Sequence, residues 1–499
     1  MVEIVIDGER VIGKVNPLIF GQNLEHLQNI VYGGIFDEAS KLSDARGFRK
    51  DVVAALQRIR PRILRWPGGN FASGYHWKNG IGPKNERPVS YDLAWSSEQS
   101  NRFGTEEFIE YCRAVGAEPY ITVNAGSGTP EEAAHWVEYC NWKGNSYYAK
   151  LREICGHPEP HNVKYWSIGN EMWGDFQIGA LSAEEYARKC RETAKLMKRT
   201  DPGIKLTAVG ETLGSFEPEL YWNLEVLKTA GDLIDYLSIH RYYYIKSEVE
   251  EKDYYNLLAC PIFSEMKLNM VVKLIDVAKS YLRKDKDIKI SMDEWNFRAR
   301  PLCSALATAR FFNVLQRLCN WVTIGGFFPA FLILDDNRLF MSGGLMSVEK
   351  EGILLESSYC AFDLYANHTG EIVLDTRVQS EAYDAELSSI ALNDPRSVKI
   401  QVPYVDSSAT LSTDGRTLFI ATVNAHKNEA IEAKVRLRDL SVRRAGRVFE
   451  LNGPHVMASN NAENPNEVKI TRKSMDNGDD SFFYEFPPHS ATVIELQVG

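Results

Sequence analysis

The sequence predicts an α/β protein, a (β/α)8 TIM barrel followed by a C-terminal all-β sandwich of jelly-roll type. Three observations support this prediction. Up to about residue 370, eight short apolar runs alternate with longer segments of helical periodicity. Polar residues follow nearly every run, as they do at the C-terminal face of such a barrel. Beyond residue 370 there are only short alternating strands separated by turns.

The eight expected barrel strands are short runs bounded by turn residues. Helical patterns between them include 47–60, with its apolar residues on one face, and 129–140, which begins with Thr and Pro as many helices do. An open doubly wound sheet is the competing architecture, and it is disfavoured because no G-x-G-x-x-G motif follows the first run. In chain order the runs are PLIFGQNLE, RILRWPGGN, AEPYITVNAG, VKYWSIGNE, IKLTAVGET, IDYLSIHRY, DIKISMDEW and NWVTIGGFF.

These patterns divide the chain into three segments. Residues 1–15 form a strand that precedes the barrel and is expected to join the distant sandwich. Residues 16–370 form the catalytic barrel, which is longer than the ~250 residues of the plain fold and therefore carries insertions. Residues 371–499 form the C-terminal sandwich.

The composition is that of a soluble globular protein, with 499 residues, 44% hydrophobic, 25% charged and a net charge of −10. A negative chain disfavours nucleic acid and anionic membranes as partners, because both need a basic patch. There is no leader-like N-terminus and no apolar stretch of about 18 residues, so we expect a cytoplasmic protein. Eight cysteines without C-x-x-C spacing predict free thiols rather than a zinc site or disulfides.

The ends of the predicted strands carry the side chains best suited to chemistry. A barrel gathers the C-terminal ends of all its strands around one mouth, so these residues are expected to share a site. In strand order they are Glu25 and His26, Arg65 and Asn70, Asn124, Asn170 and Glu171, Glu211, His240 and Tyr242, and Asp293 and Glu294.

Glu171 and Glu294 end the fourth and seventh strands, so they are expected to face each other across the mouth. Hydrolysis of a glycosidic bond requires such a pair, because one carboxyl protonates the leaving oxygen while the other attacks or activates water. The sequence thus predicts a glycosidase site that uses no metal and no cofactor. Tryptophans near these ends can stack on sugar rings: Trp66, Trp77, Trp95, Trp173 and Trp295.

Other interpretations remain open. An Asn-Glu pair is common at helix starts and surfaces, and a single histidine such as His240 is more often a hydrogen-bonded core residue than a catalytic one. A non-catalytic sugar-binding barrel would be expected to lack one glutamate, and both are present. A metal-dependent hydrolase could use His26, His240 and Asp293, but the chain has no H-x-H or H-E-x-x-H spacing.

The chain from about residue 15 to 300 resembles glycoside hydrolase family 51, the α-L-arabinofuranosidases. The matching stretches are VYGGIFDEAS, DARGFRKDVVAAL, RWPGGNFASGYHWKNGIGP, RPVSYDLAWSS, FGTEEFIEYCRAVGAEPYITVN, GTPEEAAHWVEYCN, WSIGNEMWGDFQIG, SIHRY and MDEWN. The resemblance implies a retaining enzyme that releases terminal arabinofuranosyl residues, with Glu171 as general acid/base and Glu294 as nucleophile. It further implies residues that hold the sugar ring or orient the glutamates, namely Glu25, Arg65, Asn70, Asn170, His240 and Tyr242.

The sequence departs from the family pattern in two places that bear on the substrate. After Glu171 the family usually shows M-D-G-P-W, whereas residues 172–176 here are MWGDF. We expect Trp173 and Trp95 to contact the substrate. Segment 322–356 also departs, and Glu356 is the nearest counterpart of a family glutamine.

An endo-glucanase or xylan-directed glycosidase of the same family therefore stays an alternative. The partner implied by the resemblance is an arabinofuranosyl-containing oligosaccharide or polysaccharide, and the family suggests a homo-oligomer, a hexamer.

Overall fold

A computed structural model describes the chain except for residues 212–215, 244–249, 284–285, 333–342, 388–397 and 476–478. Its centre is a closed barrel of eight parallel strands in the order β10-β11-β2-β3-β6-β7-β8-β9. The predicted TIM barrel is therefore confirmed, and all eight apolar runs contribute a strand. The strands are β2 Gln22–Asn23, β3 Ile63–Trp66, β6 Glu118–Val123, β7 Tyr165–Ile168, β8 Lys205–Val209, β9 Tyr236–Tyr243, β10 Lys289–Phe297 and β11 Val322–Phe327.

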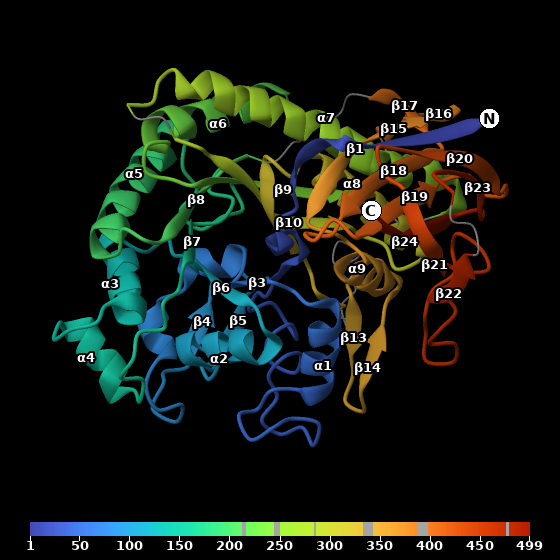
Figure 1. Cartoon of the computed structure of the whole chain (residues 1–499). Coiled ribbons are helices and arrows are strands. Elements are labelled where there is room, and N and C mark those ends of the chain that lie inside the picture. The colour runs from blue at the N-terminus through green and yellow to red at the C-terminus, as the bar shows by residue number, and fades with distance from the viewer. Residues whose placement is uncertain (212–215, 244–249, 284–285, 333–342, 388–397, 476–478) are drawn as a thin grey trace.

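Helices pack around the outside of the barrel (Figure 1). Side chains at the start of some of these helices accept hydrogen bonds from the free backbone N–H groups of the first turn. Thr129 accepts a hydrogen bond from the backbone of Glu132 ahead of Pro130, and Ser182 and Glu185 form a reciprocal capping box. The helices are α1 Lys50–Ile59, α2 Thr105–Val115, α3 Pro130–Asn141, α4 Tyr147–Ile154, α5 Ala183–Thr200, α6 Phe216–Ala230, α7 Tyr254–Lys279, α8 Leu302–Arg317 and α9 Ser357–Asn367.

The interior of the barrel is filled below the mouth. Ile324, Ile63, Tyr165 and Tyr236 lie on β11, β3, β7 and β9, which alternate around the barrel, and they belong to one buried cluster. This is the layered packing expected of four side chains from alternate strands. The packed layer leaves only the C-terminal ends of the strands free to form a site.

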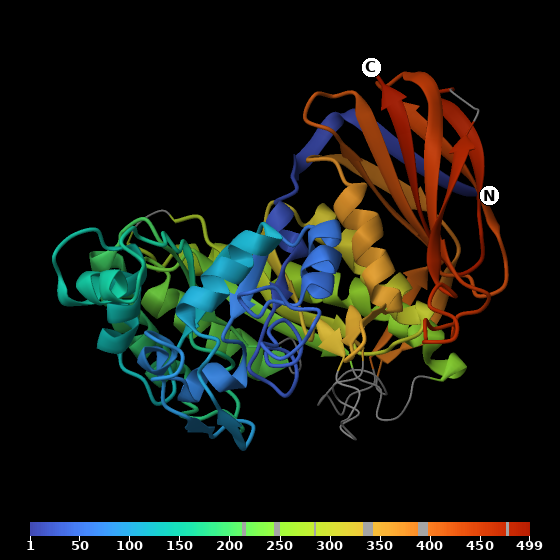
Figure 2. The same ribbon diagram turned by 90° about the horizontal axis from the view of Figure 1, so that it is seen from below.

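The C-terminal part of the chain is mostly sheet. Nine strands pair in the order β22-β21-β24-β19-β18-β15-β1-β20-β23, and they surround an apolar core of their own. Figure 2 shows this sheet beside the barrel, with both chain termini on it. The jelly-roll connection remains a prediction. The strands are β1 Val2–Lys14, β15 Ile372–Gln379, β18 Val405–Leu411, β19 Thr417–Asn424, β20 Ile431–Arg438, β21 Val442–Asn452, β22 Lys469–Met475, β23 Ser481–Phe486 and β24 Ser490–Val498.

The N-terminal strand β1 lies within this sheet, far along the chain from its partners. It runs antiparallel to β15 and parallel to β20. Ile4 and Ile6 point into the apolar core of the sheet and are fully buried. A segment that precedes the barrel in sequence thus helps to hold the C-terminal sheet together.

Two expectations from composition can be compared with the structure. All eight cysteines are free thiols, as expected. Among the described helices, none combines the length and the hydropathy that crossing a lipid bilayer requires.

Candidate active site

Glu171 lies in a sharply turned segment directly after β7. Gly169 has a φ of 85° and Glu171 a φ of 43°, a left-handed conformation that is uncommon for a residue with a side chain. Such strain persists only where surrounding contacts hold it, and it concentrates at functional sites. Here the backbone N–H of Gly174 donates to the carbonyl of Glu171 at 2.9 Å.

The same turn is held from the other side by Gln177, which is buried. Its side-chain amide donates to the backbone carbonyl of Asn170 at 2.8 Å and to the hydroxyl of Ser73 at 2.6 Å. Gln177 therefore ties the peptide that precedes Glu171 to the loop after β3. Gln177 was not predictable from the sequence, because its partners are distant in sequence or belong to the backbone.

Glu294 lies on β10, where the strand ladder is irregular. The register with β9 shifts between Ser291 and Glu294, and the register with β11 shifts between Met292 and Trp295. Bulges of this kind re-aim side chains. As a result the consecutive residues Asp293 and Glu294 are both buried and both contact His240.

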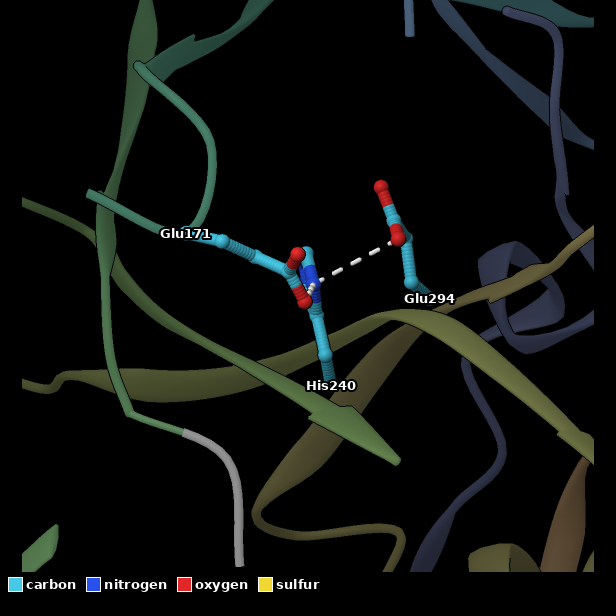
Figure 3. Close-up of side chains that lie close together, drawn as sticks. All are labelled: Glu171, His240 and Glu294. Atoms are coloured by element: carbon cyan, nitrogen blue, oxygen red, sulfur yellow. Dashed lines mark hydrogen bonds and ion pairs between the residues drawn. The ribbon is translucent and has the colours of Figure 1, made fainter. Parts of the chain in front are cut away.

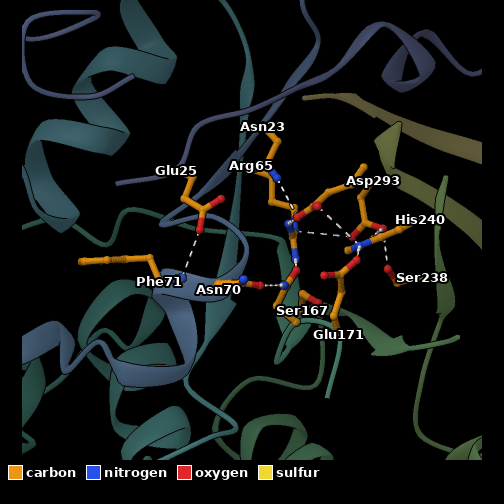
Figure 4. A network of polar contacts seen from close by, with 12 residues as sticks. Asn23, Glu25, Arg65, Asn70, Phe71, Ser167, Glu171, Ser238, His240 and Asp293 are labelled. Atoms are coloured by element: carbon orange, nitrogen blue, oxygen red, sulfur yellow. Dashed lines mark hydrogen bonds and ion pairs between the residues drawn. The ribbon is translucent and has the colours of Figure 1, made fainter. Parts of the chain in front are cut away.

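Three donors from neighbouring strands hold the carboxylate of Glu294. Arg65 Nη1 lies 2.6 Å from Oε1, Asn23 Nδ2 donates to the same oxygen at 2.9 Å, and the Tyr242 hydroxyl donates to Oε2 at 2.6 Å. Figure 4 shows Asn23 and Arg65 within a wider network of polar contacts that also includes His240 and Asp293. Asn23 is a further site residue that the sequence analysis missed. Its position two residues before Glu25 in a strand-like run, which puts both on one face, is the signal that identifies it.

His240 lies between the two glutamates (Figure 3). Its Nδ1 is 2.9 Å from Glu171 Oε1 and 3.5 Å from Glu294 Oε2. One nitrogen of His240 and one oxygen of each glutamate all lie within 4.8 Å of one another. The structure therefore brings together the two carboxyl groups that the sequence placed on separate strands.

The charges around His240 keep it protonated. Burial alone would lower its pKa, but the charge of Glu294, a hydrogen bond with Asp293 and the contact with Glu171 raise the pKa to about 10. Burial would likewise raise the pKa of Asp293, yet its hydrogen bond with His240 and the charge of Arg65 lower it to about 2. At neutral pH His240 is thus a cation whose Nδ1 donates a hydrogen bond to Glu171 and whose Nε2 forms an ion pair with Asp293 at 3.5 Å.

Within the described part of the chain, Glu171, His240 and Glu294 are the one group of acidic, histidine and cysteine side chains close enough to hold a metal ion. A protonated imidazole has no lone pair for a metal, so this arrangement suits hydrogen bonding better than ligation. His26, considered above as a ligand with His240 and Asp293, lies elsewhere. It accepts a hydrogen bond from Trp66 Nε1 at 2.9 Å, and burial lowers its pKa to about 3.

Arg65 connects Glu294 to the residues around Asn170. Its Nη2 donates to Asn170 Oδ1 at 2.8 Å, and Asn170 Nδ2 in turn donates to Asn70 Oδ1 at 3.4 Å. Gly69 lies close to the carboxyl groups of both Glu294 and Glu25, where a side chain would not fit. A Cβ at Gly69 would lie 3.1 Å from Glu294 Oε1 and 3.0 Å from Glu25 Oε2, so a side chain would crowd both carboxyl groups.

Glu25 forms a second acidic group on this side of the mouth. Its Oε1 accepts hydrogen bonds from the backbone of Phe71 and from Trp95 Nε1, both at 3.0 Å. Burial, reinforced by the charge of Glu294, raises its pKa to about 8. Glu25 is therefore mostly protonated at neutral pH and can donate a hydrogen bond to a ligand oxygen.

The predicted tryptophans divide into two groups. Trp95 and Trp173 are half-buried and can contact a ligand. Trp173 packs edge-on against Phe176, with 5.7 Å between ring centroids, and Phe176 is exposed. The expectation that Trp66, Trp77 and Trp295 flank a sugar is wrong, because each is at most 1% exposed and belongs to the core.

Three other predicted residues lie outside this network of hydrogen bonds. Glu356 is buried and binds Arg300 at 2.9 Å and the Ser347 hydroxyl at 2.5 Å, so a contact with substrate stays a prediction. Asn124 caps its own loop through the backbone of Gly128. Glu211 follows β8, and burial raises its pKa to about 7.

Comparison with known proteins agrees with this site. Residues 55–257 match the family described as Alpha-L-arabinofuranosidase 1 domain, and residues 293–490 match the Alpha-L-arabinofuranosidase C-terminal domain. The chain is 33% identical to alpha-L-arabinofuranosidase C of Emericella nidulans, over 98% of this chain and 96% of that protein. It is 32% identical to the intracellular exo-alpha-(1→5)-L-arabinofuranosidase of Halalkalibacterium halodurans, over 87% of each.

Solved structures agree with the sequence comparisons. The alpha-L-arabinofuranosidase from Thermotoga maritima, solved as an arabinose complex, is 42% identical and superimposes with a TM-score of 0.89 over 100% of both chains. The regions that match the two family models include both glutamates, most of the barrel strands and most strands of the C-terminal sheet. The chain belongs to the α-L-arabinofuranosidases of glycoside hydrolase family 51.

Proposed function

We propose that this protein is a retaining α-L-arabinofuranosidase that releases terminal α-L-arabinofuranosyl residues from oligosaccharides or polysaccharides by double displacement. The observation that carries the proposal is the spacing of Glu171 and Glu294, since a carboxyl oxygen of one lies within 4.8 Å of a carboxyl oxygen of the other. Retaining glycosidases hold their carboxyl groups about 5–5.5 Å apart, whereas inverting enzymes need about 6.5–9.5 Å to admit a water.

In the first step Glu294 attacks the anomeric carbon and forms a glycosyl-enzyme ester. Glu171 donates its proton to the glycosidic oxygen, so the leaving sugar departs as a neutral alcohol. Two cations, Arg65 and His240, face the three carboxyl groups of Glu171, Asp293 and Glu294.

In the second step water replaces the departed sugar on the same face. Glu171, now ionised, takes a proton from this water, whose oxygen attacks the anomeric carbon and releases Glu294. Two successive inversions leave the configuration unchanged. His240, hydrogen-bonded to Glu171 at 2.9 Å, keeps the carboxyl oriented in both roles.

The remaining residues hold the arabinofuranosyl ring. Asn170, oriented by Arg65 and Asn70, is the donor for the 2-hydroxyl, a contact that strengthens as positive charge develops on the ring. Protonated Glu25 offers a donor, and Trp95, bonded to Glu25, offers an indole face. Trp173 is assigned to the leaving-group side because it lies two residues after Glu171, and Glu356 stays a second candidate for substrate contact.

The alternative functions have less support. Neither an endo-glucanase nor a xylan-directed glycosidase is favoured, since the relatives described above carry the arabinofuranosidase name over most of this chain. A non-catalytic barrel would not need the strained turn at Glu171 or three donors on Glu294.

Location, assembly and domain limits are also proposals. A cytoplasmic location is supported by the word intracellular in the name of the H. halodurans relative. Exo action is supported by the word exo in the same name. A hexamer is proposed from the family, and native mass spectrometry tests it. We retain 16–370 as the barrel, and 1–15 with 371–499 as the sandwich.

The test of the proposed chemistry uses the two glutamates separately. Glu294→Ala should abolish turnover of p-nitrophenyl α-L-arabinofuranoside, because no group replaces the nucleophile. Glu171→Ala should retain formation of the ester from this activated substrate, and azide should accelerate its release as an arabinosyl azide of retained configuration. Near-normal turnover by Glu294→Ala would overturn the assignment.

A further inference from the structure

A buried arginine lies over the ring of the tyrosine that contacts Glu294. The Arg298 guanidinium carbon is 4.1 Å from the centroid of the Tyr242 ring, and Arg298 is only 5% exposed. The strand ladder explains the contact. Tyr242 on β9 pairs with Asn296 on β10, and Arg298 follows Asn296 by two residues, so it returns to the same face. Phe328 packs edge-on against the same ring, with 6.5 Å between centroids.

This stacking acts on the hydrogen bond between Tyr242 and Glu294, which is 2.6 Å long. A cation over an aromatic face is attracted by the negative quadrupole of the ring, most strongly where water is excluded. Electron density drawn toward the guanidinium makes the phenolic O–H a better donor. The stack also restricts rotation of the ring, so the hydroxyl stays aimed at the carboxylate.

We propose that Arg298 is a positioning residue for the nucleophile, acting through Tyr242: it fixes the ring and strengthens the hydrogen bond that holds Glu294 Oε2. The inference rests on the proposed function of Glu294 and adds a residue that does not itself contact the carboxylate. It predicts that losing Arg298 weakens the nucleophile only while the Tyr242 hydroxyl is present.

The charged and titratable groups around Glu294 come from several strands. Arg65 on β3 and His240 on β9 are the cations in direct contact with it, and Glu171 and Glu25 are the nearby carboxyl groups after β7 and β2. These groups remain in place in an Arg298 variant. A change in the pH profile of such a variant therefore reports the loss of the cation on Tyr242.

Arg241 provides a control on β9, the strand that carries Tyr242. It is also 5% exposed, and its guanidinium lies 4.6 Å from the centroid of the neighbouring Tyr243 ring. The Tyr243 hydroxyl, however, pairs with the Ser264 hydroxyl at 2.7 Å and not with Glu294. Removing Arg241 disturbs β9 and a similar arginine–tyrosine contact, but leaves the hydrogen bond between Tyr242 and Glu294 in place.

The experiment measures kcat/KM for p-nitrophenyl α-L-arabinofuranoside across pH in Arg298→Met, Arg298→Lys and Arg241→Met. Arg298→Met should lower kcat/KM about ten-fold and move the acid limb of the profile to higher pH, because the ionised nucleophile is less stabilised. Arg298→Lys, which keeps the charge, should leave the limb closer to that of the wild type. Arg241→Met should not move it.

A double-mutant cycle with Tyr242→Phe isolates the route through the hydroxyl. In the Tyr242→Phe background, Arg298→Met should change kcat/KM less than two-fold. An equal loss in both backgrounds, or an unmoved acid limb, would overturn the proposal. If Arg298→Met melts below the assay temperature, the cycle is run with Arg298→Gln, which also removes the positive charge, and judged in the same way. Failure of the proposed function is a separate result, since it is read from turnover by Glu294→Ala.

Discussion

Gln177→Leu is the substitution that best tests how the turn at Glu171 is held. Leucine approximates the size of glutamine but cannot donate. The change leaves the carbonyl of Asn170 and the hydroxyl of Ser73 without the amide that lies 2.8 Å and 2.6 Å from them. Because Gln177 is buried at 4% exposure, water does not easily replace it.

The magnitude follows from these two contacts. A buried polar group left without its partner costs about 1–3 kcal/mol, so the two together should lower the free energy of unfolding by ~2–6 kcal/mol. The strained φ of 43° at Glu171 is then no longer fully held, and the carboxyl shifts. A misplaced general acid loses part of its roughly 100-fold to 10,000-fold contribution.

The assay compares two leaving groups. A poor leaving group, the sugar of an arabino-oligosaccharide, depends on protonation by Glu171, whereas nitrophenolate does not. We expect kcat/KM to fall ~10- to 100-fold for the oligosaccharide and less than about 5-fold for p-nitrophenyl α-L-arabinofuranoside.

Gln316→Leu is the matched control for stability. Gln316 is 1% exposed, donates to the Thr369 hydroxyl at 3.1 Å and accepts from the Ser408 hydroxyl at 2.5 Å. It should lower the melting temperature by a similar amount and leave both kinetic values unchanged. Equal losses on the two substrates in Gln177→Leu, or no loss on either, would refute the account of the turn.

Three further predictions concern charge in the site. Arg65→Lys keeps the positive charge but removes the guanidinium, which binds Glu294 and Asn170 through two different nitrogens. We therefore expect kcat/KM for the nitrophenyl substrate to fall about 100-fold. An unchanged value would show that the positive charge alone suffices. The pKa values of Glu25 and His240 rise on folding, from 4.5 to about 8 and from 6.5 to about 10, so the folded state binds more protons and its stability should fall as pH rises through these windows. Chemical denaturation between pH 5 and 10 measures this, and a rising stability would contradict it. EDTA should leave activity unchanged because protonated His240 cannot ligate a metal, and loss of activity that zinc or manganese restores would contradict that.

The barrel was predictable from sequence because its strands are covered on both sides. Strands of this kind need continuous apolar runs, and the chain must turn polar where they reach the mouth. The run VKYWSIGNE illustrates both requirements, since it forms β7 Tyr165–Ile168 and then delivers Asn170 and Glu171. Glu294, at the end of a similar run, followed from the same logic.

Features that depend on register or on distant partners were not predictable. Side-chain direction in a strand changes with each residue, so sequence alone did not separate the core residues Trp66 and Trp295 from the half-buried Trp95. The start of α7 at Tyr254 was not predictable either, because Pro261 lies inside this helix and a proline in a helical pattern normally indicates a boundary. The stack of Arg298 on Tyr242 requires the pairing of β9 with β10.

The most direct test of the central claim is to trap the covalent intermediate. A 2-deoxy-2-fluoro arabinofuranosyl donor with an activated leaving group should inactivate the enzyme by forming a stable ester. Fluorine slows both steps, whereas the activated leaving group restores the rate of the first step only. The double-displacement account predicts one sugar per chain, located on Glu294 by mass spectrometry of the digested protein. A label on another residue, or hydrolysis of the natural linkage with inverted configuration, would contradict it.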